Sequence, residues 1–259
     1  MRRLIIEEPV SRPAKWSPTV ASFALVVTVM AVVLIRFGRV DYTAGFVVLG
    51  TGLGLALLSI LLSGMAFLRI WQEGRRGFGS AMRGALIAVL VLAYPSWFAV
   101  RAVTLPPIAD VSTDTENPPA FSRSRAALEA RGGVVPPEVS AADRELQREA
   151  YVQIAPITLD LPPEEAFEIV RKAAQNRGWQ IVEAVKPGGR LGLGRLDAID
   201  RSFLLKLPDD VTVRLRPRAD GTRIDIRSAS RFGGHDLGAN ARRIRAFLEE
   251  VSNLAIAAG

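Results

Sequence analysis

Long apolar runs dominate the first 105 residues of the chain, and short charged segments separate them. The three uncharged runs cover residues 16–35, 42–68 and 84–100. A helix needs about 20 apolar residues to cross the hydrocarbon of a bilayer. The third run reaches that length if Arg101 extends its guanidinium to the headgroups, so that the helix continues to Leu105 before two prolines end it. One such run is also typical of a buried core helix, but three in succession predict three membrane-spanning helices within residues 16–105.

Basic residues are distributed unevenly among the segments that flank these helices. The tail, residues 1–15, and the loop of residues 69–83 each carry four Lys or Arg, whereas the first loop carries two and Arg101 follows alone. The positive-inside rule therefore predicts a cytoplasmic tail and second loop, with everything after residue 105 outside the cytoplasm. The first helix is long and lacks a small-x-small cleavage site, so we expect it to remain as an anchor.

The second predicted helix carries Gly50 and Gly54 at a spacing that lets two helix backbones approach closely, and Ser59 and Ser63 repeat that spacing. We favour packing among the three helices of one chain as the explanation, and the alternative is a homodimer through Gly50 and Gly54. The helix interiors carry no acidic residue and no His. An ion or proton pathway normally needs one, so transport is disfavoured.

A linker, residues 106–153, follows the apolar part. Residues 110–119 are rich in Asp, Ser, Thr and Pro without a helical or strand period, which predicts an extended loop. Phe121 is a hydrophobic anchor by which we expect the linker to pack on the domain that follows. A short polar helix is expected between residues 138 and 151.

Residues 154–259 alternate between strand and helix periods. The clearest element is a hairpin of residues 211–227, in which aliphatic and polar residues alternate on both sides of a turn at 219–221. The other predicted elements are a strand at 157–161, a helix at 162–177, strands at 179–185, 191–199 and 202–207, and a helix at 236–253. Most connections are too short for parallel crossovers. We therefore predict an α+β domain with a mostly antiparallel sheet of about five to six strands, whose apolar face two helices cover.

The overall composition suggests nucleic acid as a partner, because a net charge of +7 and a pI near 10.5 are typical of nucleic-acid-binding proteins. Residues 1–105, however, hold 11 basic against 4 acidic residues, and residues 106–259 hold 22 of each. The excess charge is thus part of the membrane topology, and nucleic acid is excluded as a partner. The chain has no Cys, so no disulfide stabilises the domain.

Polar residues at the start of the last predicted helix are the strongest candidate for a site. Asp236 can accept hydrogen bonds from the exposed N–H groups of that helix, and Asn240 and Arg243 follow on the same side. We expect them to connect the strand end at 228–231 to the loop at 110–114. The resulting cluster, either a structural clamp or the floor of a ligand site, contains Asp114, Ser230, Arg231, Asp236, Asn240 and Arg243.

Charge is also separated within the domain. Residues 106–168 hold 5 basic and 12 acidic residues, and residues 169–259 hold 17 and 10. One hairpin face carries the basic residues Arg214, Arg216, Arg223 and Arg227. This face is predicted to meet anionic lipid headgroups or the acidic linker, and an ordinary solvated strand face is the third alternative.

The sequence gives little indication of a catalytic site or a metal site. A hydrolase would use Ser230, His235 and Asp236, but adjacent residues rarely form a triad and no G-x-S-x-G turn is present. A calcium site would have to use acids such as Asp110, Asp114 and Glu116, whose spacing matches no known calcium loop. We therefore expect no cofactor and no metal, and we expect turn-capping roles for these acids.

Three separated motifs carry a family resemblance. They are residues 110–114 (DVSTD) with 117–121 (NPPAF), residues 227–231 (RSASR) and residues 236–244 (DLGANARRI). Over residues 106–252 the chain resembles the bacterial family built on domain of unknown function 1499, and members with several N-terminal spans resemble proteobacterial inner-membrane proteins. The family has no established activity. The resemblance therefore implies an inner-membrane protein with a periplasmic domain, which we expect to be non-enzymatic and to bind an envelope protein or lipid, with the hydrolase as the alternative.

Overall fold

The computed structural model describes residues 9–189 and 192–258. Contacts divide the chain into two units. The first contains residues 1–100 together with Leu204–Lys206, and the second contains Arg101–Phe203 and Leu207–Gly259.

The first unit is helical. Its helices are α1 (Arg12–Arg36), α2 (Tyr42–Glu73) and α3 (Phe78–Thr104), the last of which ends in the second unit. Local signals explain their bounds, since Asp41 caps the start of α2 by accepting a hydrogen bond from Ala44 N–H at 2.9 Å, and Gly74 ends it at φ 65°. All three helices are long and apolar enough to cross a membrane. The three predicted spans are confirmed as candidate spans, and α3 does continue past Arg101.

Small residues bring the helices together. Gly45, Gly52, Ala56, Ser59, Ser63 and Ala66 form the buried side of α2. The Ser59 hydroxyl donates to the Ser17 carbonyl of α1 at 2.9 Å, and Gly52 lies so close to Thr28 that a Cβ would clash with the Thr28 side chain. Large apolar side chains such as Phe23, Leu61 and Leu90 are instead exposed on the outside, as lipid-facing side chains are.

The second unit contains a six-stranded, wholly antiparallel sheet. Its strands are β1 (Asp110–Ser112), β2 (Ile157–Leu159), β3 (Gln180–Val185), β4 (Gly194–Arg201), β5 (Pro208–Arg218) and β6 (Gly221–Ser230). The order is β1-β6-β5-β4-β3, and β2 pairs with the other half of β6. Its helices are α4 (Arg125–Ala130), α5 (Ala141–Ala150), α6 (Pro163–Asn176) and α7 (Ala239–Ala258). The α+β prediction is confirmed.

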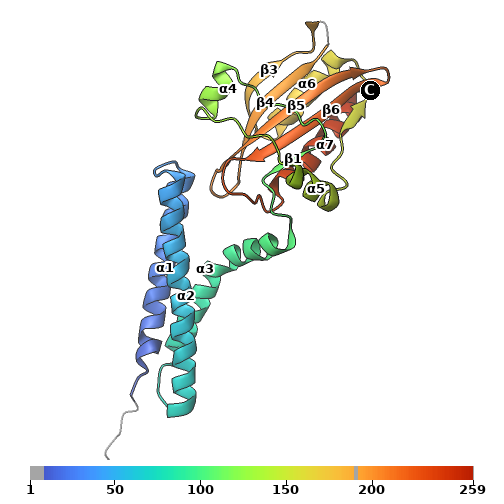
Figure 1. Ribbon diagram of the computed structural model, residues 1–259. Coiled ribbons are helices and arrows are strands. Elements are labelled where there is room, and N and C mark those ends of the chain that lie inside the picture. The colour runs from blue at the N-terminus through green and yellow to red at the C-terminus, as the bar shows by residue number, and fades with distance from the viewer. Residues whose placement is uncertain (1–8, 190–191, 259) are drawn as a thin grey trace, which may run out of the picture. The chain divides into compact units, whose positions relative to one another are not determined.

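The two faces of the sheet differ in chemistry because side chains alternate along each strand. The aliphatic residues of β4, β5 and β6 point to one face, where α6 and α7 cover them (Figure 1). Phe167 of α6 and Phe247 of α7 are fully buried there, and Trp179 stacks on Phe247 with ring centroids 4.7 Å apart. The opposite face carries charged residues, and the segment between β1 and α5 covers part of it.

Three details of the sequence interpretation need correction. Residues 202–207 form a loop and not a strand, because Ser202 N–H donates to the Leu207 carbonyl at 2.9 Å and Lys206 takes a left-handed conformation at φ 56°. The linker is more regular than predicted, since its residues Asp110–Ser112 pair with β6 and Arg125–Ala130 form α4. The predicted strand at 191–199 begins at Gly194, and residue 191 lies outside the described residues.

Candidate functional site

The charged face of the sheet consists of every second side chain along three adjacent strands. Its side chains come from β4, β5 and β6, and residues 113–140, here called the strap, run across them from β1 to α5. The strap is held in register at its start, where Thr113 N–H donates to the Ile226 carbonyl at 2.9 Å and the Thr113 hydroxyl accepts from Ile226 N–H at 2.9 Å. At the edge of β1, Gln147 of α5 exchanges two hydrogen bonds with the Ser112 backbone.

A fully buried arginine fastens the far part of the strap. The Arg131 guanidinium donates to Asp197 at 2.7 Å, to Asp210 at 3.2 Å and to the Ser122 carbonyl at 2.7 Å, and its side chain is 0% exposed. Arg231 makes a second, two-pronged pair with Asp210 at 2.8 and 2.9 Å. Burial raises the pKa of Asp197 above its ordinary value, although Arg131 and Ser122 N–H act in the opposite direction.

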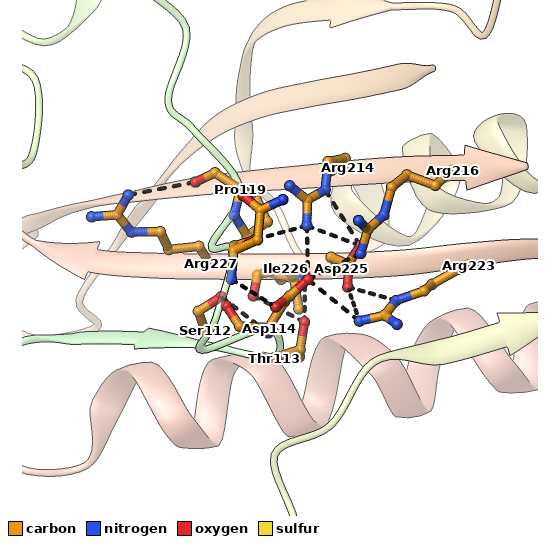
Figure 2. A network of polar contacts seen from close by, with 11 residues as sticks. Ser112, Thr113, Asp114, Pro119, Arg214, Arg216, Arg223, Asp225, Ile226 and Arg227 are labelled. Carbon is orange, nitrogen blue, oxygen red and sulfur yellow. Dashed lines mark hydrogen bonds and ion pairs between the residues drawn. The ribbon is translucent and has the colours of Figure 1, made fainter. Parts of the chain in front are cut away.

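Nearer the start of the strap, two carboxylates share three arginines (Figure 2). Asp225 of β6 is completely buried and pairs with Arg214, Arg216 and Arg223 at 2.8–3.3 Å. Oδ2 of Asp114, on the strap, lies 3.0–3.4 Å from the same three guanidiniums, while its Oδ1 accepts from Asn117 N–H at 2.9 Å. Burial would raise the pKa of Asp114, but the Asn117 N–H and the neighbouring arginines together hold it below its ordinary value.

Three residues of the predicted basic face, Arg214, Arg216 and Arg223, thus pair with Asp114 of the acidic linker. Arg227, the fourth residue of that face, is buried and pairs with Asp110 of β1 at 2.7 Å. It also donates to the Pro137 carbonyl of the strap at 2.7 Å, and its guanidinium lies 4.8 Å from the ring centre of Phe121. The Arg131 guanidinium lies 5.2 Å from the ring centre of Phe121, the expected anchor of the linker.

A cavity of about 340 Å³ opens beside Arg227, between two stretches of the strap and the first turn of α5. Phe121, Pro118 and Val139 give it apolar walls, and Arg123, Arg144 and Arg227 give it three guanidiniums. Two acids, Glu116 and Glu138, also line it. Within the described part of the chain Arg123 makes no hydrogen bond or ion pair, and Arg144 donates only through Nε, to the Val139 carbonyl at 3.2 Å. The cavity thus offers unused donors beside apolar surface.

A second polar cluster lies on the helix side of the sheet. The buried Asn240 of α7 accepts from the Ser228 hydroxyl at 2.8 Å and donates to the Ala109 carbonyl at 2.9 Å and to Ser230 Oγ at 3.1 Å. One turn on, Arg243 pairs with Asp200 at 2.6 Å and with Asp209, and it also donates to Ser228 Oγ at 2.9 Å. This cluster attaches α7 to β4, β5 and β6.

The structure brings four of the six predicted cluster residues together. Ser230, Asn240 and Arg243 join in this network, and Asp236 lies directly before it, with its carboxylate accepting from Gly238 and Asn240 N–H at 2.8 and 2.6 Å. Asp114 and Arg231 lie on the opposite face, because strand alternation separates Arg231 from Ser230. Asp200 and Asp209 were not predicted, although the alternation of the neighbouring strands places them on the helix side. Arg131 was not predicted either, because its position in a loop carries no sequence signal.

The three residues of the hydrolase hypothesis are close in sequence but differently engaged. His235 Nδ1 accepts from Leu237 N–H at 3.1 Å, and its Nε2 lies 3.2 Å from the Ala102 carbonyl. Both Asp236 oxygens accept backbone N–H groups, and Ser230 Oγ accepts from Asn240. Each side chain thus serves a structural hydrogen bond.

The acids considered for calcium are paired with arginines. Asp110 bonds to Arg227, Asp114 to three arginines, and Glu116 to Arg148 at 2.7 Å. Among residues 9–189 and 192–258, no group of three or more His, Cys, Asp or Glu side chains is arranged to hold a metal ion.

The second unit of the chain matches the model of a known protein family. The family model described as "Protein of unknown function (DUF1499)" matches residues 110–251, which is more than half of the chain. No curated protein matches the chain. The matched range begins at β1 and ends in α7, so it contains the sheet, the strap and both polar clusters.

Proposed function

The chain belongs to the DUF1499 family, and from that premise we propose that it is a bacterial inner-membrane protein whose C-terminal domain, outside the cytoplasm, binds an anionic group. The group is a phosphate or carboxylate carried by an envelope lipid or by an envelope protein. The domain holds this ligand without transforming it.

The cavity on the charged face carries the proposal. Its volume of about 340 Å³ lies in the range of small-ligand sites, and it combines apolar walls with converging polar donors. All three arginines line the cavity: the Arg227 guanidinium is held by Asp110 and the Pro137 carbonyl, and Arg123 and Arg144 retain unused donors. Guanidiniums bind carboxylate and phosphate oxygens in pairs of parallel hydrogen bonds. Anions are therefore the ligand class that this chemistry recognises.

The hydrogen bonds of Ser230, His235 and Asp236 support binding rather than hydrolysis. Because His235 Nδ1 accepts from Leu237 N–H, the proton of the neutral ring is on Nε2, which faces the Ala102 carbonyl and not Ser230. His235→Asn retains an acceptor for Leu237 N–H and removes any general base. We expect this variant to bind ligand as the wild type does and to support the same cellular phenotype.

The placement of the domain outside the cytoplasm is supported by the eight basic residues of the tail and second loop against three elsewhere. Alkaline phosphatase fused after Asp110 should be active, and the same enzyme fused after Arg76 should be inactive. An inactive fusion at Asp110 would place the domain in the cytoplasm.

Binding is tested on the full-length protein in a zwitterionic detergent. Dihexanoyl phosphatidylglycerol and a glutamate-rich peptide represent the two ligand sources, and dihexanoyl phosphatidylcholine is the neutral control. The double variant Arg123→Gln/Arg144→Gln should weaken binding of the anionic probe about tenfold or more, since it removes charge-assisted donors. Arg125→Gln, which changes an exposed arginine paired with Glu129, should have no effect. Equal binding by all three proteins would contradict the proposed site.

A further inference from the structure

The loop between β4 and β5 has a composition that is unusual for a surface turn. Residues 202–207 read Ser-Phe-Leu-Leu-Lys-Leu, and Arg201 precedes them. The Phe203 side chain is 85% exposed. Turns of soluble domains are normally polar, so three consecutive apolar residues in this loop require an explanation.

Hydrogen bonds between its first and last residues close the loop. Ser202 N–H donates to the Leu207 carbonyl at 2.9 Å, and Leu207 N–H donates to the Ser202 hydroxyl at 2.9 Å, so the loop is closed at its base from both sides. Lys206 takes the left-handed conformation, which costs energy for a residue other than glycine. The fold thus holds Phe203, Leu204 and Leu205 at the tip of a preformed loop.

Strand register gives the position of this loop in the domain. Arg201 pairs with Pro208, and the next strand pairs Asp209 with Ser230, so the loop leaves the end of the sheet at which β6 finishes. Asp110 pairs with Ala229, which places the start of β1 at that same end. The turn between β5 and β6, which contains Asp220, lies at the opposite end of these strands.

The same end of the sheet receives the chain from the membrane. Only residues 105–109 separate the end of α3 from β1, and five residues span at most about 17 Å. The last turn of α3 also contacts the loop that follows β6, because Arg101 donates to the Leu237 carbonyl at 3.0 Å. The β4–β5 loop therefore leaves the sheet at the end to which the membrane anchor is attached.

We infer that the β4–β5 loop inserts into the headgroup region of the bilayer that the helices cross. Phe203, Leu204 and Leu205 enter the boundary between headgroups and acyl chains, as the apolar side of interfacial segments does. Arg201 and Lys206 remain at the level of the lipid phosphates, where their stems cover apolar surface and their charges meet anionic lipids. The loop is thus a second membrane contact, separate from the proposed anion site.

The absence of Cys from the sequence permits a direct test. Phe203→Cys and, separately, Leu205→Cys are labelled with a fluorophore in the full-length protein reconstituted in vesicles of phosphatidylcholine and phosphatidylglycerol. Asp220→Cys, at the other end of the sheet, is the matched control. Nitroxide-bearing lipids should quench the labels at positions 203 and 205 at least several-fold more than the label at 220, and aqueous iodide should show the reverse order.

Two results would overturn the inference. Labels at positions 203 and 205 that iodide quenches as strongly as the label at 220 would show that the loop lies in water. Labels protected from both quenchers would show that protein, for example the helices of the same chain, covers the loop instead of lipid. If the labels at positions 203 and 205 give the same quenching pattern, the result does not depend on a local effect of one substitution.

Discussion

Arg131 and Asp197 form an ion pair of 2.7 Å in which neither side chain is exposed to solvent. The pair joins a loop residue of the strap to the middle of β4, and a second carboxylate, Asp210, lies 3.2 Å from the same guanidinium. The charged face of the sheet results from the alternation of side chains along its strands. The Arg131–Asp197 pair attaches the strap to this face.

Arg131→Met should therefore destabilise the domain by about 3 kcal/mol, because it leaves Asp197 buried without its closest cation. Hydrogen exchange of the β4 and β5 amides in the full-length protein measures the loss for this domain separately from the helices. The double variant Arg131→Met/Asp197→Asn should recover part of the lost stability, since the buried carboxylate at position 197 that lacked Arg131 is gone, while Arg195, 3.1 Å from Asp197 in the wild type, remains charged. Arg125→Met, at an exposed position of α4, should change stability by less than about 0.5 kcal/mol. A loss in Arg131→Met no larger than in Arg125→Met would contradict this role.

The Asp114 carboxylate gives the stability of the strap a pH dependence. Its pKa in the folded protein lies below the ordinary value of 3.8, so its contribution is fully present above that value and is lost as the pH falls through it and below. Asp114→Asn should cost about 1–2 kcal/mol at pH 7, because three guanidiniums lose a charged acceptor. Urea unfolding of both proteins from pH 7 to pH 3 measures the difference. The difference in unfolding free energy between wild type and variant should become smaller below about pH 4. A difference that does not depend on pH would contradict the electrostatic explanation of this contact.

Asn240 is the centre of the helix-side cluster. Asn240→Ala should lower the free energy of unfolding by about 2–3 kcal/mol. The variant leaves three groups without their hydrogen-bond partner: the hydroxyls of Ser228 and Ser230 and the carbonyl of Ala109. Asn253→Ala, at an exposed position of the same helix, is the matched control and should be neutral. Thermal unfolding compares the two variants. If Asn240→Ala is as stable as Asn253→Ala, the cluster is not a structural clamp.

Two glycines of α2 should respond differently to the same substitution. A Cβ on Gly52 would lie 2.4 Å from Thr28 Oγ1 and 3.2 Å from the Thr28 backbone nitrogen, whereas a Cβ on Gly50 would meet nothing within 4 Å. Gly52→Val should disrupt the packing of α1 on α2 and lower the yield of folded protein from membranes several-fold, and Gly50→Val should not. Equal yields would contradict the packing described here.

Gly54, like Gly50, lies outside the contacts between helices of one chain, so packing within the chain does not explain this pair of glycines as the sequence analysis had favoured. A homodimer through them stays a prediction. Cross-linking of Gly50→Val and wild-type protein in membranes would test it, with loss of the dimer expected only in the variant.

The sequence predicted those parts of the fold that depend on periodicity. The three apolar runs, the hairpin of β5 and β6, and the helices α6 and α7 all follow from hydrophobic spacing, which local burial controls. Residues 202–207 were misassigned because their apolar composition is typical of a buried strand, although they form an exposed loop.

The candidate site could be predicted only in part. Asp236, Asn240 and Arg243 were found because a helix start places them on one side. Arg131 and Asp197 could not be paired from sequence, since 66 residues separate them and their contact depends on how the strap crosses the sheet. The cavity beside Arg227 could not be predicted for the same reason, because two stretches of an irregular segment, the first turn of α5 and Arg227 of β6 line it.

The central claim, that the charged face holds an anionic ligand at the cavity of Arg123, Arg144 and Arg227, is tested most directly by native mass spectrometry of the full-length protein purified gently from bacterial membranes. The account predicts an anionic lipid or an acidic protein bound to the wild type and to Arg125→Gln. It predicts loss of that species from Arg123→Gln/Arg144→Gln. An unchanged bound species in the double variant, or none in the wild type, would contradict it.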